Sequence, residues 1–146
     1  MANQLKSRLQ ADRNQARKQR DKERTLVLST VLADVRYREI EDGREANDDV
    51  VLQVLSKAIK QRKDAAEQMR SGGREELAAV EDAQADVLGA YLPEGMSEED
   101  VRALVREAIA AGATQMGPLM ATLMPKLRGR FDGKEANRIV REELGA

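Results

Sequence analysis

A short basic segment near the C-terminal end has the residue types that bind phosphate groups. Residues 126–134 read KLRGRFDGK, in which four bases are interspersed with two glycines and one phenylalanine. Gly129 would let the backbone approach a phosphate closely, and a helix that begins after the segment would offer free N–H groups. Phe131 could stack on a base or a sugar, as aromatic residues of RNA-binding proteins do, or could equally fill a hydrophobic core. The segment therefore predicts an anion-binding site and leaves both roles of Phe131 open.

A second group of bases lies in the N-terminal half of the chain. Eight basic residues stand against three acidic ones between residues 6 and 24. Further along, Lys60, Lys63 and Arg70 recur near one face of a predicted helix. These bases could form a second anion-binding surface, or could be solvated or paired with acids of neighbouring helices. The candidates for this second surface are Arg13, Arg17, Lys18, Arg20, Lys60 and Lys63.

The charge is unevenly spread although the formal net charge is −1. Residues 39–50 contain six acids against one base, and residues 73–100 contain nine acids against one base. Residues 126–138 contain five bases against two acids. An anionic partner would therefore meet the basic ends of the chain and avoid its acidic middle. The alternative is that these charge runs are ordinary solvated helix faces.

Several classes of chemistry are excluded by residue type. The sequence contains no cysteine and no histidine, which removes disulfides, thiolate sites, Ser-His-Asp sites and the commonest zinc ligand. It contains no GxxxxGK[ST] or GxGxxG phosphate loop and no calcium-loop spacing. Acid clusters such as residues 98–100 fit the first turn of a helix, where they favour the dipole. We therefore expect no catalytic residue, no metal and no cofactor.

The expected location is the cytoplasm. The sequence becomes charged directly after its first residues and has no apolar segment typical of a signal peptide. No apolar run approaches the roughly 18 residues that a membrane-spanning helix needs. The absence of cysteine fits a reducing compartment.

These candidate residues must be positioned by helices. Aromatic residues are only 2% of the chain, and the best helix-forming residues dominate it, so sheets are disfavoured. Leu28, Val31, Leu32 and Val35 follow the period of one buried helix face. Seven helices are predicted. The first ends near residue 18, the second covers 21–42, the third runs from 47 or 48 to 71, and the fourth ends at 91. The fifth begins after 97, the sixth near 117–118, and the seventh near 132.

Local signals predict where several of these helices begin and end. Gly43 suits a helix C-terminus, Asn47 suits an N-cap, and Ser97 with Asp100 forms a capping box. Pro118 is expected at the first position of its helix. Residues 93–96, PEGM, are the only clear linker. We therefore predict an all-α fold with an N-terminal four-helix unit at residues 1–92 and a small three-helix domain at residues 93–146.

Three motifs in this order resemble the YqeY family. They are KQRKD at residues 60–64, YLPE at residues 91–94, and a spaced series of Met, Gly, Pro, Lys, Arg and Asn from residue 116 to residue 140. The resemblance covers nearly the whole chain. The C-terminal part is also similar to the tail of GatB, a subunit of the tRNA-dependent amidotransferase that converts Glu-tRNA(Gln) or Asp-tRNA(Asn) to the amide. The resemblance implies an N-terminal helical bundle and a three-helix GatB-tail-like domain that faces tRNA.

Two positions depart from the family pattern. Pro118 stands where the family usually has lysine, and Phe131 stands where it usually has a small residue. The predicted nucleic-acid-binding set consists of the matching motif positions implied to face tRNA, the neighbouring bases, and Phe131, whose role the resemblance does not imply. The matching positions are Lys126, Gly129, Arg130, Gly133, Lys134 and Asn137. The whole set is Lys126, Arg128, Gly129, Arg130, Phe131, Gly133, Lys134, Asn137 and Arg138.

The expected function is that of an accessory protein in translation that binds tRNA. An amidotransferase or an aminoacyl-tRNA synthetase could act beside it. A carbon–nitrogen ligase activity is implied only by kinship to GatB. The residues themselves do not support it, because an amidase site would need a Ser-Ser pair and the sequence contains none. The alternative is a helical adaptor that docks a partner protein and has no role with RNA. The sequence leaves open which tRNA and which partner protein are bound.

Overall fold

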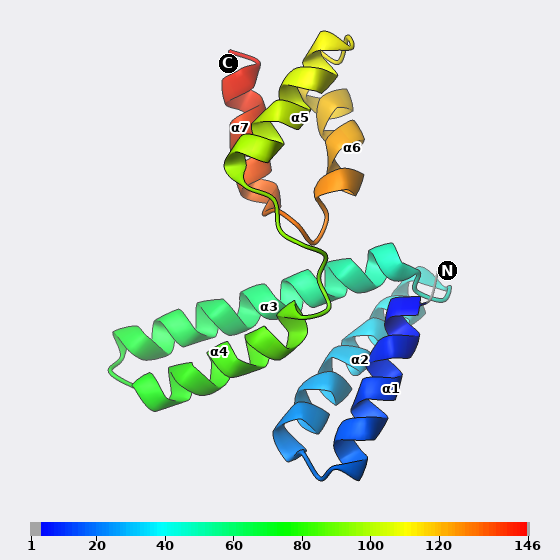
Figure 1. Cartoon of the computed structure of the whole chain (residues 1–146), viewed down its shortest axis with the longest axis vertical. Coiled ribbons are helices and arrows are strands. Elements are labelled where there is room, and N and C mark those ends of the chain that lie inside the picture. The colour runs from blue at the N-terminus through cyan, green and yellow to red at the C-terminus, as the bar shows by residue number, and fades with distance from the viewer. Residues whose placement is uncertain (1–3, 146) are drawn as a thin grey trace. The chain divides into compact units, whose positions relative to one another are not determined.

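The computed structural model describes residues 4–145, and these residues form seven α-helices and no strand (Figure 1). The all-helical fold class is therefore confirmed. The helices are α1 (Gln4–Lys18), α2 (Lys22–Asp42), α3 (Asp48–Ser71), α4 (Glu75–Gly89), α5 (Glu98–Ala110), α6 (Met116–Leu127) and α7 (Gly133–Glu143).

Side chains and glycines satisfy the free backbone groups at several helix ends. The Asn47 side chain accepts a hydrogen bond of 2.9 Å from the N–H of Val50. Ser97 and Asp100 each accept from the other's backbone N–H, so the predicted capping box is present. Gly43 ends α2 with a φ of 69°, a conformation that glycine adopts without cost. All three predicted signals are confirmed.

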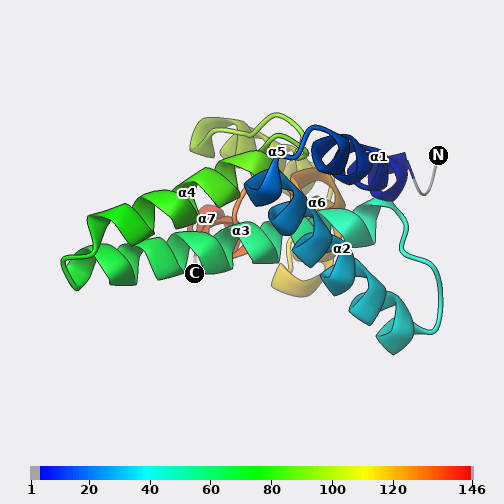
Figure 2. The ribbon, with the colours of Figure 1, turned by 90° about the horizontal axis from the view of Figure 1, so that it is seen from below.

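The helices lie in two compact units that divide between Leu92 and Pro93. In the first unit, α1 and α2 form one antiparallel pair and α3 and α4 form another (Figure 1). Helix α2 crosses and contacts both α3 and α4, as the second view shows (Figure 2). The predicted face of α2 is buried in this core. The core consists of Leu9, Val27, Leu28, Val31, Leu32, Val35, Ala46, Val51, Leu55, Ala58, Leu88 and Tyr91.

In the second unit, each of α5, α6 and α7 packs against the other two. Met116 and Met120 are partly buried and pack against the edge of this core, where the flexible methionine side chain fills gaps. The fully enclosed part consists of Val101, Val105, Leu119, Leu123, Leu127, Ala136, Ile139 and Val140.

Two boundaries differ from the predictions. Helix α6 begins at Met116, so Pro118 is its third residue and not its first. Proline is tolerated there because the first N–H groups of a helix have no intrahelical partner. Helix α4 ends at Gly89, two residues before the predicted Tyr91. A tight turn follows, in which the N–H of Tyr91 donates to the carbonyl of Leu88 at 3.1 Å.

This turn directs Tyr91 toward α1. The Tyr91 hydroxyl donates a hydrogen bond of 2.5 Å to the carboxylate of Asp12, and the guanidinium of Arg8 lies 4.7 Å from the ring centre. Burial, followed by the bond to Asp12, raises the pKa of Tyr91 to about 12. The tyrosine of the YLPE motif therefore ties the end of α4 to α1.

Candidate nucleic-acid interface

The predicted anion-binding segment is built around a tight turn between α6 and α7. Arg128 has φ −59° and ψ 125°, and Gly129 has φ 74°. The carbonyl of Leu127 accepts from the N–H of Arg130 at 2.8 Å. These angles and this bond describe a type II turn, in which the third residue needs a positive φ. The glycine is therefore required by the backbone itself.

Arg130 connects this turn to the segment that precedes α5. Its carbonyl accepts a hydrogen bond of 2.9 Å from the N–H of Met96. Its Nε donates to the carbonyl of Glu94, also at 2.9 Å. Although the Arg130 side chain is exposed, part of its hydrogen-bonding capacity is therefore used within the C-terminal unit.

The other predicted residues around the turn differ in exposure. Lys126 and Lys134 are exposed, whereas Arg128 and Asn137 are half-buried. Phe131 is half-buried and packs against the core of the C-terminal unit. The packing role of Phe131 is thus present in this structure, and a stacking role would have to use its remaining exposed edge.

Gly133 is the first residue of α7. A Cβ atom added there would lie 3.8 Å from the terminal methyl of Met124, which is an ordinary contact. The space around Gly133 therefore does not explain why the residue is glycine.

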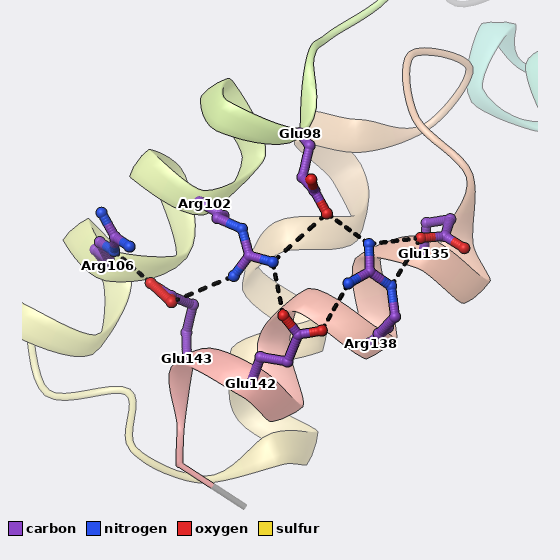
Figure 3. Close-up of polar contacts among 7 residues, drawn as sticks. All are labelled: Glu98, Arg102, Arg106, Glu135, Arg138, Glu142 and Glu143. Carbon is purple, nitrogen blue, oxygen red and sulfur yellow. Dashed lines mark hydrogen bonds and ion pairs between the residues drawn. The ribbon is translucent and has the colours of Figure 1, made fainter.

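Arg138, the last member of the predicted set, lies within a group of ion pairs between α5 and α7 (Figure 3). Its guanidinium nitrogens lie 2.5 Å from the carboxylate of Glu98, 2.8 Å from that of Glu135 and 2.6 Å from that of Glu142. The bond to Glu98, followed by those to the other two carboxylates, raises the pKa of Arg138. A phosphate would have to compete with three carboxylates for this side chain.

Two arginines of α5 extend the same group (Figure 3). Arg102 lies 2.6 Å from Glu142, 3.5 Å from Glu98 and 3.4 Å from Glu143, and Arg106 pairs with Glu143. We call this set the α5–α7 ion-pair network. It consists of Glu98, Arg102, Arg106, Glu135, Arg138, Glu142 and Glu143.

The network contains three arginines and four glutamates, so it has no surplus of positive charge. Sequence reasoning assigned Arg138 to phosphate and Glu98 only to the helix N-terminus. A signal was available, because Glu98 and Arg102 are four residues apart, as are Arg138 and Glu142. The bonds between α5 and α7 link residues about forty apart in the chain and carry no local signature.

The network should make the C-terminal unit sensitive to acid. Hydrogen bonds from arginines hold the pKa values of three carboxyls below their usual 4.5. The donor is Arg138 for Glu98, Arg102 for Glu142, and Arg106 for Glu143. A carboxyl whose pKa is lower in the folded than in the unfolded protein stabilises the fold at pH values above its unfolded-state pKa. This stabilisation is lost as the pH falls through its folded-state pKa. Thermal unfolding of α5–α7, followed by NMR, should therefore occur at clearly lower temperature at pH 3 than at pH 6.

A matched pair of variants isolates the network in this experiment. Glu142→Gln removes a carboxylate that contacts both Arg102 and Arg138, so the acid-induced loss should become smaller. Glu99→Gln changes an exposed acid in the same unit and should leave the pH dependence as it is. An acid response that is the same in Glu142→Gln as in the unmodified protein would show that other groups cause it.

The second predicted surface is dispersed over the N-terminal unit. Arg13, Arg17 and Lys18 lie on α1, and Arg20 lies in the turn that follows with a φ of 60°. Lys60 and Lys63 are exposed on α3. Lys60 lies 3.4 Å from Asp64 on the same helix, a solvated pair that contributes little stability.

Among residues 4–145, no group of three or more acidic side chains is arranged to hold a metal ion. In the same range, no helix combines the length and the apolar character needed to cross a membrane.

Comparison with known proteins identifies the family. The family model described as Yqey-like protein matches residues 6–144. The chain belongs to the YqeY family. The family that the motifs indicated is therefore confirmed.

Two fungal proteins are similar to this member of the YqeY family. One is the altered inheritance of mitochondria protein 41, mitochondrial, of Pyrenophora tritici-repentis, which is 27% identical over 95% of this chain and 80% of its own length. The other is an uncharacterized protein of Schizosaccharomyces pombe, which is 38% identical over 55% of this chain and 65% of its own length. The first name describes a mitochondrial protein, so kinship does not support a cytoplasmic location.

Proposed function

We propose that this protein is an accessory protein in translation that binds tRNA through exposed basic side chains and does no chemistry of its own. The observation that carries the proposal is the arrangement at the α6–α7 turn. Lys126 and Lys134 are exposed on either side of it, whereas the three arginines of the α5–α7 ion-pair network are paired with glutamates. Exposed cations beside a fixed turn suit the phosphate backbone of a nucleic acid.

The resemblance of the C-terminal unit to the GatB tail supports tRNA as the nucleic acid. It also suggests an amidotransferase or an aminoacyl-tRNA synthetase as a protein that acts beside it. The proposal requires a compartment with tRNA, such as the cytoplasm or the interior of a mitochondrion. The latter fits the name of the Pyrenophora relative.

The decisive experiment is a titration with bulk tRNA at several salt concentrations. Affinity should fall steeply as salt rises, because each Lys or Arg that contacts a phosphate displaces a bound counterion. Removing one such contact lowers the slope of log K against log salt by about 1. The double variant Lys126→Gln/Lys134→Gln should therefore lower the slope by about 2.

Arg141→Gln is the control for the lost charge, since Arg141 is an exposed base of α7 outside the predicted set. It should change the slope little. If neutralising Lys126, Arg128, Arg130, Lys134 and Arg138 together leaves tRNA affinity weak and unchanged, the C-terminal unit does not bind tRNA.

A helical protein–protein adaptor is the second candidate. The observation in its favour is a set of large apolar side chains exposed on two helices of the N-terminal unit. They are Leu26, Tyr37 and Ile40 on α2, and Leu77 and Val80 on α4. Failure of the tRNA titration would favour this candidate over RNA binding.

A further inference from the structure

A hollow of about 340 Å³ lies between α1 and α2 of the N-terminal unit. Leu32 and Ala33 form its apolar part. The polar and charged lining residues are Lys6, Gln10, Arg13, Ser29, Arg36 and Glu39. Three of these six side chains are basic, and only Arg13 was singled out from the sequence.

Glu39, the acid of the hollow, is already used within the protein. Its carboxylate accepts hydrogen bonds from the Lys6 ammonium and from the N–H of Ala46, each at 2.8 Å. These bonds, that of Lys6 first, lower the pKa of Glu39, so the carboxylate stays ionised and paired with Lys6. Glu45 also lies 3.7 Å from Lys6. The charges of Lys6 and Glu39 therefore offset each other.

Arg13 and Arg36 keep their charge available to a ligand. Within residues 4–145, the hydrogen bonds of the Arg13 side chain go to the neutral amide oxygen of Asn14 alone, at 3.3 and 3.4 Å. Arg36 makes no hydrogen bond or ion pair with any residue from 4 to 145, although its charge contributes to lowering the pKa of Glu39. It also lines the adjoining hollow, together with Arg44. Neither arginine is hydrogen-bonded or ion-paired to a carboxylate among residues 4–145, so both guanidinium groups have donors free for a ligand.

We propose that the α1–α2 hollow binds a phosphate group between Arg13 and Arg36. Guanidinium groups bind phosphate oxygens in pairs of parallel hydrogen bonds, which lysine cannot do. The hydroxyl of Ser29 and the amide of Gln10 supply further donors at the same hollow. The lining thus combines two guanidinium groups that are not ion-paired with neutral donors, a combination that suits a phosphate.

The helix period brings these residues together. Arg13 lies seven residues after Lys6 on α1, and Arg36 lies seven residues after Ser29 on α2. Seven residues are about two helical turns, so each pair lies on one face. Because α1 and α2 are packed side by side, the two faces meet at the hollow.

The phosphate could belong to the backbone of tRNA or to a small phosphorylated molecule. The tRNA arm of the test rests on the proposed function, whereas a titration with inorganic phosphate does not. NMR signals of the arginine Nε–H groups should be followed as phosphate is added at constant ionic strength. The signals of Arg13 and Arg36 should shift and saturate, and that of Arg74, an exposed arginine outside the hollow, should not.

The double variant Arg13→Gln/Arg36→Gln should then be titrated with tRNA, with Arg74→Gln as the control for the lost charge. If the hollow holds an RNA phosphate, the double variant lowers the salt slope by about 2 and the control does not. An unchanged slope with a saturable phosphate shift assigns the site to a small phosphorylated ligand.

The proposal is overturned if the Arg13 and Arg36 signals shift no more than that of Arg74 and the double variant binds tRNA as the unmodified protein does. If the unmodified protein binds no tRNA, the proposed function fails and the phosphate titration alone decides about the hollow.

Discussion

Leu123→Ala is expected to unfold the C-terminal unit while the N-terminal unit stays folded. Leu123 is 1% exposed and lies in the core formed by α5, α6 and α7. Replacing a buried leucine with alanine costs about 2–5 kcal/mol, because the apolar contacts are lost and a cavity remains. A domain of this size rarely has more than about 3–5 kcal/mol of stability in total. The substitution should therefore remove most of it.

Two-dimensional ¹H–¹⁵N NMR of the full chain measures this outcome residue by residue. Signals from residues 98–143 should collapse toward random-coil positions, and those of α1–α4 should keep their dispersion. Leu77→Ala is the matched control, because Leu77 is 44% exposed and its truncation should cost little. Leu28→Ala, at a fully buried position of the N-terminal core, should give the converse pattern.

This experiment also tests whether the two units are independent domains. We propose that they are, because the chain divides between Leu92 and Pro93 and each side has its own core. Loss of both sets of signals in Leu123→Ala would show a single cooperative fold. The predicted division into a four-helix domain and a three-helix domain would then be wrong.

Gly129→Val should destabilise the C-terminal unit and abolish any tRNA binding by the α6–α7 turn. Gly129 has φ 74°, which a β-branched residue adopts only with strain. Holding a side chain in this region costs about 1–3 kcal/mol. The turn also positions Arg130, which bonds to Glu94 and Met96, so its distortion should spread to the start of α5. Thermal unfolding and tRNA titration should both report the loss.

Gly129→Asn separates backbone strain from close approach to phosphate. Asparagine tolerates the left-handed conformation, so this variant should keep the turn and the stability of the unit. If tRNA affinity also stays unchanged, glycine serves the turn only. If Gly129→Asn folds normally but loses tRNA affinity, the backbone itself approaches the phosphate, as the sequence first indicated.

The sequence by itself determined the features that depend on residues a few positions apart. It gave the helical class, the buried face from Leu28 to Val35, and the caps at Asn47 and Ser97. A cap needs only the backbone three residues away, and a buried face needs only the helix period. The motifs also sufficed to recognise the family, because their residues and order can be read from the sequence without knowing how the helices pack.

Tertiary structure alone decided which of the candidate bases have partners. Arg138 and Glu98 are forty residues apart, and only the packing of α7 against α5 brings them to 2.5 Å. Leu77 and Val80 belong to a helix whose inward positions are Ala78, Ala85 and Leu88, so both remain exposed. Arg36 was not a candidate from the sequence, and only the packing of α1 against α2 places it in the lining of a hollow. The sequence specifies which side chains are charged, but the packing of the helices decides whether a carboxylate lies close enough to neutralise a given base.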